Sequence, residues 1–227
     1  MTSDTGRVTL AVFRKDLLAE RRTKEVFTAV LLFGFTVSVA FTFAFEPTSA
    51  EARKISGGLL WLAFLFAAVL GLNRAFARET SNQSLQGLRL IPADLGGIYL
   101  GKLASNLLFL LLAEIVLLPP FGVFFDLTLW ARPGWLLLIL LLGTWGLAAL
   151  GTMFSAVSAN TRMQELMLPL LLLPLTVPVL IAAIESTVVL LEGRPMSEAA
   201  LWLKLLTGFN IVFTLLCWLL FDYVIQE

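Results

Sequence analysis

The sequence contains no histidine and a single cysteine, Cys217, among its 227 residues. The lack of His excludes zinc hydrolases built on an H-E-x-x-H motif and catalytic triads that use a His base. One Cys excludes a disulfide framework, a Cys-cluster metal site and a C-x-x-C redox pair. The 16 basic and 16 acidic residues give a formal net charge of zero. Nothing in the charge therefore indicates a nucleic acid as partner.

Charged residues are also scarce, at 14% of the chain against about 25% in an average soluble domain. Hydrophobic residues make up 59%, and the mean hydropathy is +0.90. A soluble domain of this size needs more charge to cover its surface, so the composition indicates a membrane protein. The apolar stretches are long and continuous, unlike the ten-residue alternations typical of a β-barrel. We therefore predict an all-α integral membrane protein.

Six apolar stretches are long enough to cross a bilayer as helices. They run over about residues 26–45, 57–73, 103–125, 135–159, 166–184 and 205–221. Residues 1–25 form a polar N-terminal segment, 74–102 the longest connection, and 222–227 a short tail. The first stretch has about 20 apolar residues, whereas the apolar part of a signal peptide has about 7–15. We therefore expect the first stretch to be retained as a span.

Lys and Arg are distributed unevenly between the two sets of connections. Eleven of the 16 lie in the N-terminal segment, in the connection 74–102 and at Arg162, and five lie in the other connections. Because Lys and Arg concentrate in cytoplasmic loops, both termini are predicted to be cytoplasmic. Trp130, Trp135 and Trp202 then lie at the outer ends of spans, in the headgroup layer that indole side chains favour.

The N-terminal segment has a helical arrangement of apolar side chains. One helical arc contains Leu10, Phe13, Leu17 and Leu18, and is interrupted by Arg14 and Arg21. Long cationic side chains extend toward lipid headgroups. We therefore predict an interfacial amphipathic helix along the inner membrane surface, leading into the first span. The alternative is a solvated basic leader that only orients the chain.

The connection 74–102 contains a second short helical pattern. It has polar residues from Arg78 and Glu79 onward, then Leu85 and Leu88 about one turn apart, and then Pro92, which ends any helix. A helix of this length neither spans a membrane nor folds alone. It docks on a protein partner or lies on lipid, and the pattern leaves both open.

Glu114 is the one charged residue well inside a predicted span. An ionised side chain there costs at least about 2.5–3.5 kcal/mol, so it should face protein or water. One interpretation is a polar point on a transport path or at a subunit contact. The other is a hydrogen-bonded carboxyl that ties two helices together, with Asn106 and Thr144 as candidate partners.

Three prolines, Pro169, Pro174 and Pro178, lie in the span over 166–184. Each removes a backbone donor and bends the helix. A bent helix that ends at Glu185 would form an outer gate. The alternative is a static bend that suits packing.

Small residues recur every four positions in the span over 135–159. The two sets are Ala148, Thr152 and Ala156, and Gly151, Ser155 and Ala159. Small residues at this spacing let helix backbones approach closely. We therefore predict close packing along this face, within the chain or across a dimer.

Several of these residues, taken in order, resemble a known family. The pattern from Arg78 to Pro92, followed by Gly101-Lys102, is similar to the cytoplasmic signature of ABC-2 type permeases. Segments similar to the haem exporter protein B (CcmB) family, within those permeases, are 59–66, 71–74, 101–107, 150–152, the proline-spaced 168–180 and 221–224. The resemblance covers about residues 14–224. It implies the six-helix half of an ABC-2, type V exporter-like permease.

The resemblance also implies partners and a location. CcmB proteins are permease subunits of the bacterial cytochrome c maturation system, in the inner membrane. They associate with a separate ATPase, CcmA, with CcmC and the small CcmD, and with the haem chaperone CcmE. By this resemblance, Arg78, Glu79, Leu85, Leu88 and Pro92 would contact the ATPase. The sequence has no phosphate-binding G-x-x-x-x-G-K-[ST] loop, so the partner would use the ATP and this chain would be non-catalytic.

The implied function is haem export, or release of the haem-loaded chaperone. Alternatives are a non-transporting scaffold in the same complex and an ABC-2 permease for another lipophilic substrate. Haem iron is usually held by His, Met, Cys or Tyr. With no His, we expect no cofactor on this chain, and haem only as a transported or complex-associated ligand. Six spans make half of the usual transporter core, so a second copy or another subunit should complete it.

Overall fold

The computed structural model describes residues 2–23, 25–44, 50–73, 95–127, 129–159 and 164–226. Within these residues the chain is all-helical and contains no strand. The helices in chain order are α1 (Thr2–Thr23), α2 (Glu25–Ala44), α3 (Ala50–Asn73), α6 (Leu95–Phe124), α7 (Pro133–Ala159), α8 (Gln164–Leu191) and α9 (Ala200–Gln226). A short 3-10 helix, η1 (Leu129–Ala131), precedes α7.

Six of these helices, all except α1, are long and apolar enough to cross a membrane. This confirms the predicted all-helical membrane fold with six apolar spans. Several helices extend beyond the apolar stretches. For example, α6 begins at Leu95, before the stretch that starts near residue 103. Hydropathy marks only the apolar part of a helix, whereas backbone hydrogen bonding continues into the flanking turns.

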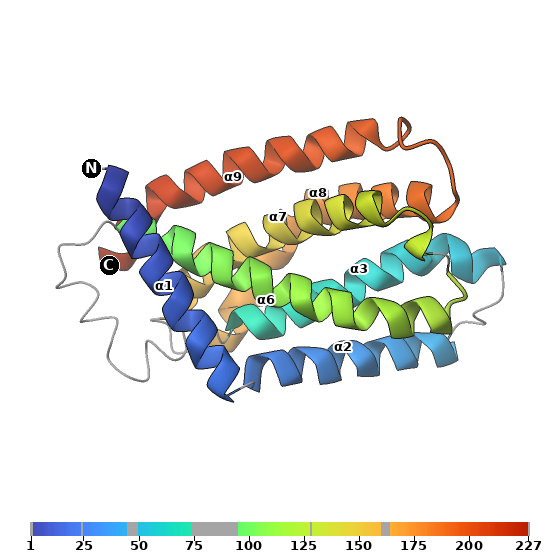
Figure 1. Ribbon diagram of the computed structural model, residues 1–227, viewed down its shortest axis with the longest axis horizontal. Coiled ribbons are helices and arrows are strands. Elements are labelled where there is room, and N and C mark those ends of the chain that lie inside the picture. The colour runs from blue at the N-terminus through green and yellow to red at the C-terminus, as the bar shows by residue number, and fades with distance from the viewer. Residues whose placement is uncertain are drawn as a thin grey trace.

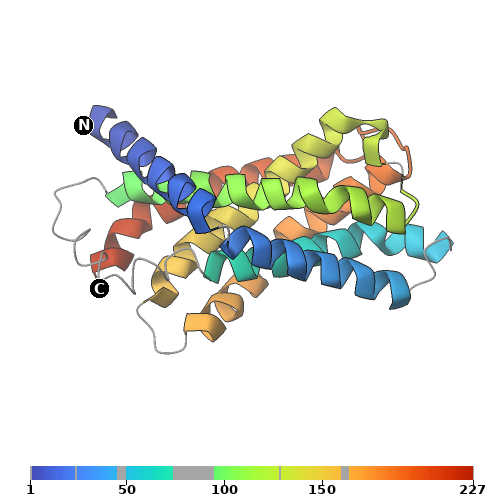
Figure 2. The ribbon, with the colours of Figure 1, turned by 60° about the horizontal axis from the view of Figure 1, so that its bottom comes forward.

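The six long helices lie side by side, and α1 crosses one end of the bundle (Figure 1). The C-terminal turns of α9 lie at the same end, which we call the α1 end (Figures 1 and 2). α7 occupies the centre, with 72% of its apolar stretch buried, whereas α2 and α9 are each only 17% buried. The small residues of α7 allow this position, because they let neighbouring helices pack closely on several sides.

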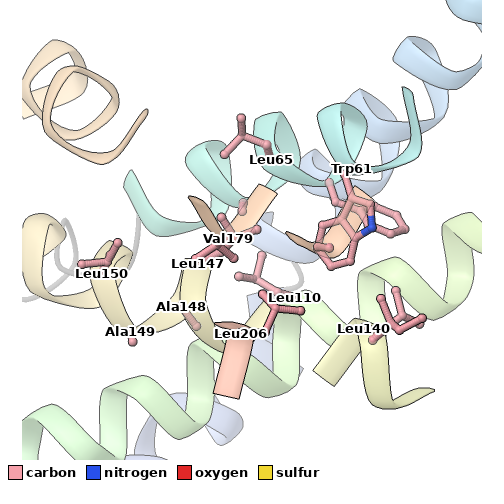
Figure 3. Packing of buried hydrophobic residues seen from close by; sticks show 14 of the residues in the cluster. Trp61, Leu65, Leu110, Leu140, Leu147, Ala148, Ala149, Leu150, Val179 and Leu206 are labelled. Atoms are coloured by element: carbon pink, nitrogen blue, oxygen red, sulfur yellow. The ribbon is translucent and has the colours of Figure 1, made fainter. Parts of the chain in front are cut away.

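The core centres on side chains from five helices, among them Trp61, Leu110, Leu147, Val179 and Leu206 (Figure 3). Lipid is as apolar as leucine, so helix association in a membrane depends on close packing and polar contacts. Burial of apolar surface away from water contributes little there. The contacts described next are therefore what fixes the arrangement of the helices.

Trp61 of α3 is fully buried and joins three helices. Its indole N–H donates a hydrogen bond of 2.9 Å to Thr187 Oγ1 of α8. Its ring fills the space where a side chain at Gly143 of α7 would begin. A Gly at this position is therefore required by packing.

Candidate functional site

The five residues predicted to contact an ATPase, Arg78, Glu79, Leu85, Leu88 and Pro92, lie outside the described residues. Their role stays a prediction. The described chain resumes at Leu95, where α6 begins at the α1 end of the bundle (Figure 2). In the chain, the segment 74–94 lies between the end of α3 at Asn73 and the first turn of α6.

Glu114 of α6 is buried, with 4% of its surface exposed. The hydroxyl of Thr144 on α7 lies 2.7 Å from each of its carboxyl oxygens and donates to the carboxyl group. Thr144 is one of the two partners expected from the sequence. The contact ties α6 to α7 and satisfies a group that is costly to leave unpaired in an apolar environment.

Asn106, the other candidate partner, takes a different neighbour. Its Nδ2 donates a 2.9 Å hydrogen bond to Thr152 Oγ1 of α7. Asn106 lies eight residues before Glu114 on the same helix, so it meets α7 farther along. Asn106 is thus not the partner of Glu114, and the two residues make separate polar contacts with α7. A further contact between these helices is the 3.2 Å hydrogen bond from the Tyr99 hydroxyl to the Ala149 carbonyl.

A small open pocket, with a cavity volume of about 20 Å³, lies beside Asn106, between α2, α3 and α6. Its lining includes Phe27 and Val30 of α2, Leu72 of α3, and Phe109 of α6. Apart from the Asn106 amide, these side chains are apolar. The pocket is therefore a small and largely apolar hollow in the surface of the bundle.

The prolines of α8 lie on its outer side. Pro174 and Pro178 are exposed and Pro169 is half-buried, whereas the packed side of the helix contains Leu172, Thr176 and Val179. Helix α8 continues through all three prolines. The prolines therefore face lipid or a partner, away from the packed interior.

Glu185 is exposed on α8, and the helix does not end there as the sequence analysis expected. It continues to Leu191. Gly193 then adopts φ +69°, and the N–H groups of Gly193 and Arg194 bond to the carbonyls of Leu190 and Val189 at 3.1 Å. This is a Schellman turn, for which Gly is preferred because it has no Cβ. Gly193 is thus the sequence signal for the true helix end.

The small residues of α7 pack within the chain. Leu72 of α3 fills the space in front of Gly151, and Ser155 Oγ donates a 2.7 Å hydrogen bond to the Leu72 carbonyl. Gly146 faces Val179 of α8 in the same way. Of the two predicted alternatives, packing within the chain is therefore observed for this face of α7.

The sequence analysis missed a contact between α1 and the first two turns of α6. At Gly97 and Gly101 the α6 backbone comes so close to α1 that a Cβ would lie 3.1 Å from Val8 and 2.8 Å from Val12. Lys102 Nζ lies 3.1 Å from Asp16 Oδ2 of α1. The available signal was the Gly-x-x-x-Gly spacing of residues 97–101, which permits close helix approach.

At the end opposite α1, hydrogen bonds join the connection between α6 and α7 to the connection between α8 and α9. The Arg132 guanidinium, after α6, donates to the carbonyl oxygens of Arg194 at 2.7 Å and Gly193 at 3.1 Å, after α8. The guanidinium of Arg194 in turn bonds to Glu192 and Glu198, which raises the pKa of Arg194. A cation at a helix C-terminus is also favoured by the helix dipole.

A comparison with the sequence models of protein families identifies the family of this chain. The sequence model of the family described as CcmB protein matches residues 7–222, nearly the whole chain. The chain belongs to the CcmB family. The match includes all the described helices that form the contacts above and the undescribed segment 74–94.

Curated relatives of this CcmB chain carry one name, Heme exporter protein B. The protein from Pseudomonas aeruginosa is 33% identical over 205 residues, covering 90% of this chain and 91% of the relative. The protein from Paracoccus denitrificans is 34% identical over 176 residues, covering 78% and 80%. The protein from Bradyrhizobium diazoefficiens is 30% identical over 190 residues, covering 84% and 85%.

The described residues of this CcmB chain contain no group of three His, Cys, Asp or Glu side chains placed to hold a metal ion. Their polar side chains instead join helices. Examples are Glu114 with Thr144, Asn106 with Thr152, and Lys102 with Asp16. These contacts hold and orient the helices of a membrane-embedded bundle, which is the arrangement expected of a permease subunit.

Proposed function

We propose that this chain is the membrane subunit of an ATP-driven complex for cytochrome c biogenesis. A separate CcmA-like ATPase would hydrolyse ATP, and the chain itself would be non-catalytic. CcmC-like and CcmD-like proteins and the CcmE chaperone would complete the assembly. The observation that supports this proposal is the CcmB family match over residues 7–222, with curated relatives named Heme exporter protein B.

In this proposal the segment around Leu85 and Leu88 seats in the ATPase. The side chains of an amphipathic helix anchor it by placing apolar residues in a groove of the partner. Because the segment 74–94 joins the end of α3 to the start of α6, closure of the ATPase would move the opening turns of α6 together with the last turn of α3. Haem, or the haem-loaded chaperone, would be released on the other side of the membrane.

The docking is tested by co-purification of the full-length chain with its ATPase from membranes. We expect Leu85→Asp to abolish the association, because a carboxylate in an apolar groove loses its hydration without gaining a partner. Leu85→Met keeps an apolar side chain of similar volume and should bind the ATPase as the wild type does. Full stoichiometric binding by Leu85→Asp would contradict the proposed contact.

The small size of the pocket favours a second function, in which haem does not pass through a single copy of the chain. The pocket between α2, α3 and α6 has a cavity volume of about 20 Å³, far below the roughly 300–1,000 Å³ of small-molecule sites. A subunit that converts ATPase motion into release of haem-loaded chaperone needs no larger cavity. In this alternative, haem never crosses the chain.

Inverted vesicles containing the complex distinguish the two functions. ATP-dependent accumulation of haem inside vesicles without chaperone supports transport. ATP-dependent release of haem-loaded chaperone, with no haem accumulation, supports the scaffold. A complex that accumulates a different lipophilic compound and leaves both haem readouts unchanged would contradict the assignment to cytochrome c biogenesis.

A further inference from the structure

Helix α1 is docked on the bundle by one face. Thr9 Oγ1 donates to the Gly97 carbonyl of α6 at 3.1 Å. The close approach at Gly97 and Gly101 brings the two backbones together over about two turns of each helix. The helix predicted over this segment was expected to contact lipid, and one of its faces in addition contacts α6.

The buried charge in this interface is Lys102. Its side chain is 4% exposed, and its Nζ lies 3.1 Å from Asp16 Oδ2, on a side chain that is 15% exposed. A buried ammonium is costly unless it is paired, so Asp16 fixes where α1 docks along α6. An apolar contact alone would let α1 slide or rotate.

The C-terminal part of α1 is joined to α2. Glu20 is buried, and its Oε1 accepts a 2.9 Å hydrogen bond from the backbone N–H of Phe27 in the first turn of α2. An acidic group at a helix N-terminus is favoured because it satisfies an unpaired N–H and the helix dipole. Helix α1 thus links the opening turns of α6 to those of α2, as Figure 2 shows at the α1 end of the bundle.

The charges of α1 are separated between its two faces. Asp16 and Glu20 lie on the docked side, whereas Arg7, Arg14 and Arg21 are exposed, seven residues apart. The acidic residues of this basic segment therefore serve attachment to the bundle. Of the spans that α1 joins, α2 is among the least buried, at 17%, and it also packs directly on α6, where Phe35 meets Phe124 and Gly34 faces Leu117.

We propose that the Asp16–Lys102 ion pair is a positioning latch that makes α1 and the start of α6 move as one body. This inference rests on the proposed function, in which an ATPase displaces the opening turns of α6. The latch carries that displacement through α1, and through the Glu20 contact with Phe27, to α2. Without the ion pair, α1 slips against α6, this route to α2 is lost, and ATP hydrolysis is less tightly coupled to the output of the complex.

The first test uses full-length chain as the sole copy in cells and measures the yield of cytochrome c with covalently attached haem. We expect Lys102→Met and Asp16→Asn each to lower this yield about tenfold, because either removes the ion pair between α1 and α6. The contact of Asp16 with Lys15 lies within α1 and does not join the two helices. The ATPase should co-purify in wild-type amounts with both variants. Arg14→Met is the matched control, since Arg14 lies on the exposed side of α1, and it should leave the yield unchanged.

Exchanging the two charges distinguishes a requirement for the ion pair from a requirement for either residue by itself. Asp16→Lys combined with Lys102→Asp restores an ion pair of opposite direction, and we expect it to recover most of the lost yield. Two results would overturn the latch. One is a wild-type yield in both single variants. The other is an exchanged pair that accumulates normally and stays as defective as the single variants.

A cross-link reports on the latch independently of the ATPase. In a Cys217→Ala background, Val8→Cys and Gly97→Cys bring two Cβ atoms to 3.1 Å, somewhat less than the roughly 3.5–4.5 Å of a disulfide, so a small outward shift of α1 allows the bond. Mild oxidation of isolated membranes should form this bond efficiently in the wild-type pair and severalfold less with Lys102→Met. An equal yield in the two would overturn the latch. Failure of the ATPase to co-purify with wild type would instead contradict the proposed function and leave the cross-linking result interpretable.

Discussion

At the scale of single residues, the packing inside this bundle is determined by buried polar atoms and by glycines, which leave space for a neighbouring side chain. Glu114 needs one donor, which Thr144 supplies. Trp61 needs an acceptor and a space, which Thr187 and Gly143 supply. Such contacts matter more in a membrane than in water, because apolar burial by itself does not favour one helix arrangement over another.

Removal of the Thr144 hydroxyl should destabilise the bundle modestly. Thr144→Val keeps the shape but leaves the Glu114 carboxyl without its donor, and hydrogen bonds of this kind are worth about 0.6–1.7 kcal/mol in membrane proteins. We expect a measurably lower unfolding temperature in detergent, with Thr144→Ser close to the wild type because it keeps the hydroxyl. Identical unfolding temperatures for Val and wild type would contradict a stabilising role for this bond.

Two glycines, one closely packed and one with open space in front of it, allow the effect of an added methyl group on stability to be compared. Gly143→Ala places a methyl group against the buried Trp61 ring, which has no room to move, whereas Gly208→Ala on α9 has no neighbour within 4 Å. Overpacking costs about 1–3 kcal/mol, while Ala in an exposed helix position gains up to about 1 kcal/mol over Gly. Unfolding measurements should therefore show loss for the first variant and no loss for the second. The reverse order would contradict the packing at Trp61.

At the scale of helices, it matters whether the residues in question lie on the exposed side or on the packed side of their helix. Residues on the packed side can transmit a movement to a neighbouring helix, whereas residues on the exposed side only bend their own. The α8 prolines are on its outer side and the helix is continuous across them. Helix α1, in contrast, uses its inner side for an ion pair, a glycine contact and a helix cap. Position in the bundle therefore makes α1 the stronger candidate for a moving element.

Pro174→Ala tests the gating role that the sequence suggested for α8. The substitution restores a backbone N–H and removes an exposed ring, so the fold should be retained and the protein should accumulate at least as well as the wild type. If the bend only suits packing, cytochrome c yield should stay within about twofold of the wild type. A large loss of yield in a well-folded Pro174→Ala protein would instead support a gate.

At the scale of the whole molecule, α1 and the end of α9 lie together, and the Arg132 contact lies at the opposite end (Figure 1). The distribution of Lys and Arg predicts that the α1 end faces the cytoplasm. A second copy of the chain stays the predicted complement to these six helices. Both expectations concern how the bundle sits in its membrane and complex.

Labelling with a membrane-impermeant maleimide tests the predicted orientation. In a Cys217→Ala background, Gly6→Cys is an exposed site on α1, and Ser197→Cys is exposed between α8 and α9. We expect intact spheroplasts to label only Ser197→Cys and inverted vesicles to label only Gly6→Cys. The opposite pattern would invert the topology and place the segment 74–94 out of reach of a cytoplasmic ATPase.

The sequence by itself determined the membrane class, the six apolar spans and the family, because lipid allows a chain to cross only as long apolar helices or a closed barrel. It also indicated that Glu114 requires a partner. Only the tertiary structure decided that Thr144 is that partner, that the α8 prolines face outward and that α1 docks on α6. These features depend on how far each helix is rotated about its axis. A helix that is apolar on all sides gives no sequence pattern for that rotation, whereas packing at Gly143, Gly97 and Gly101 fixes it.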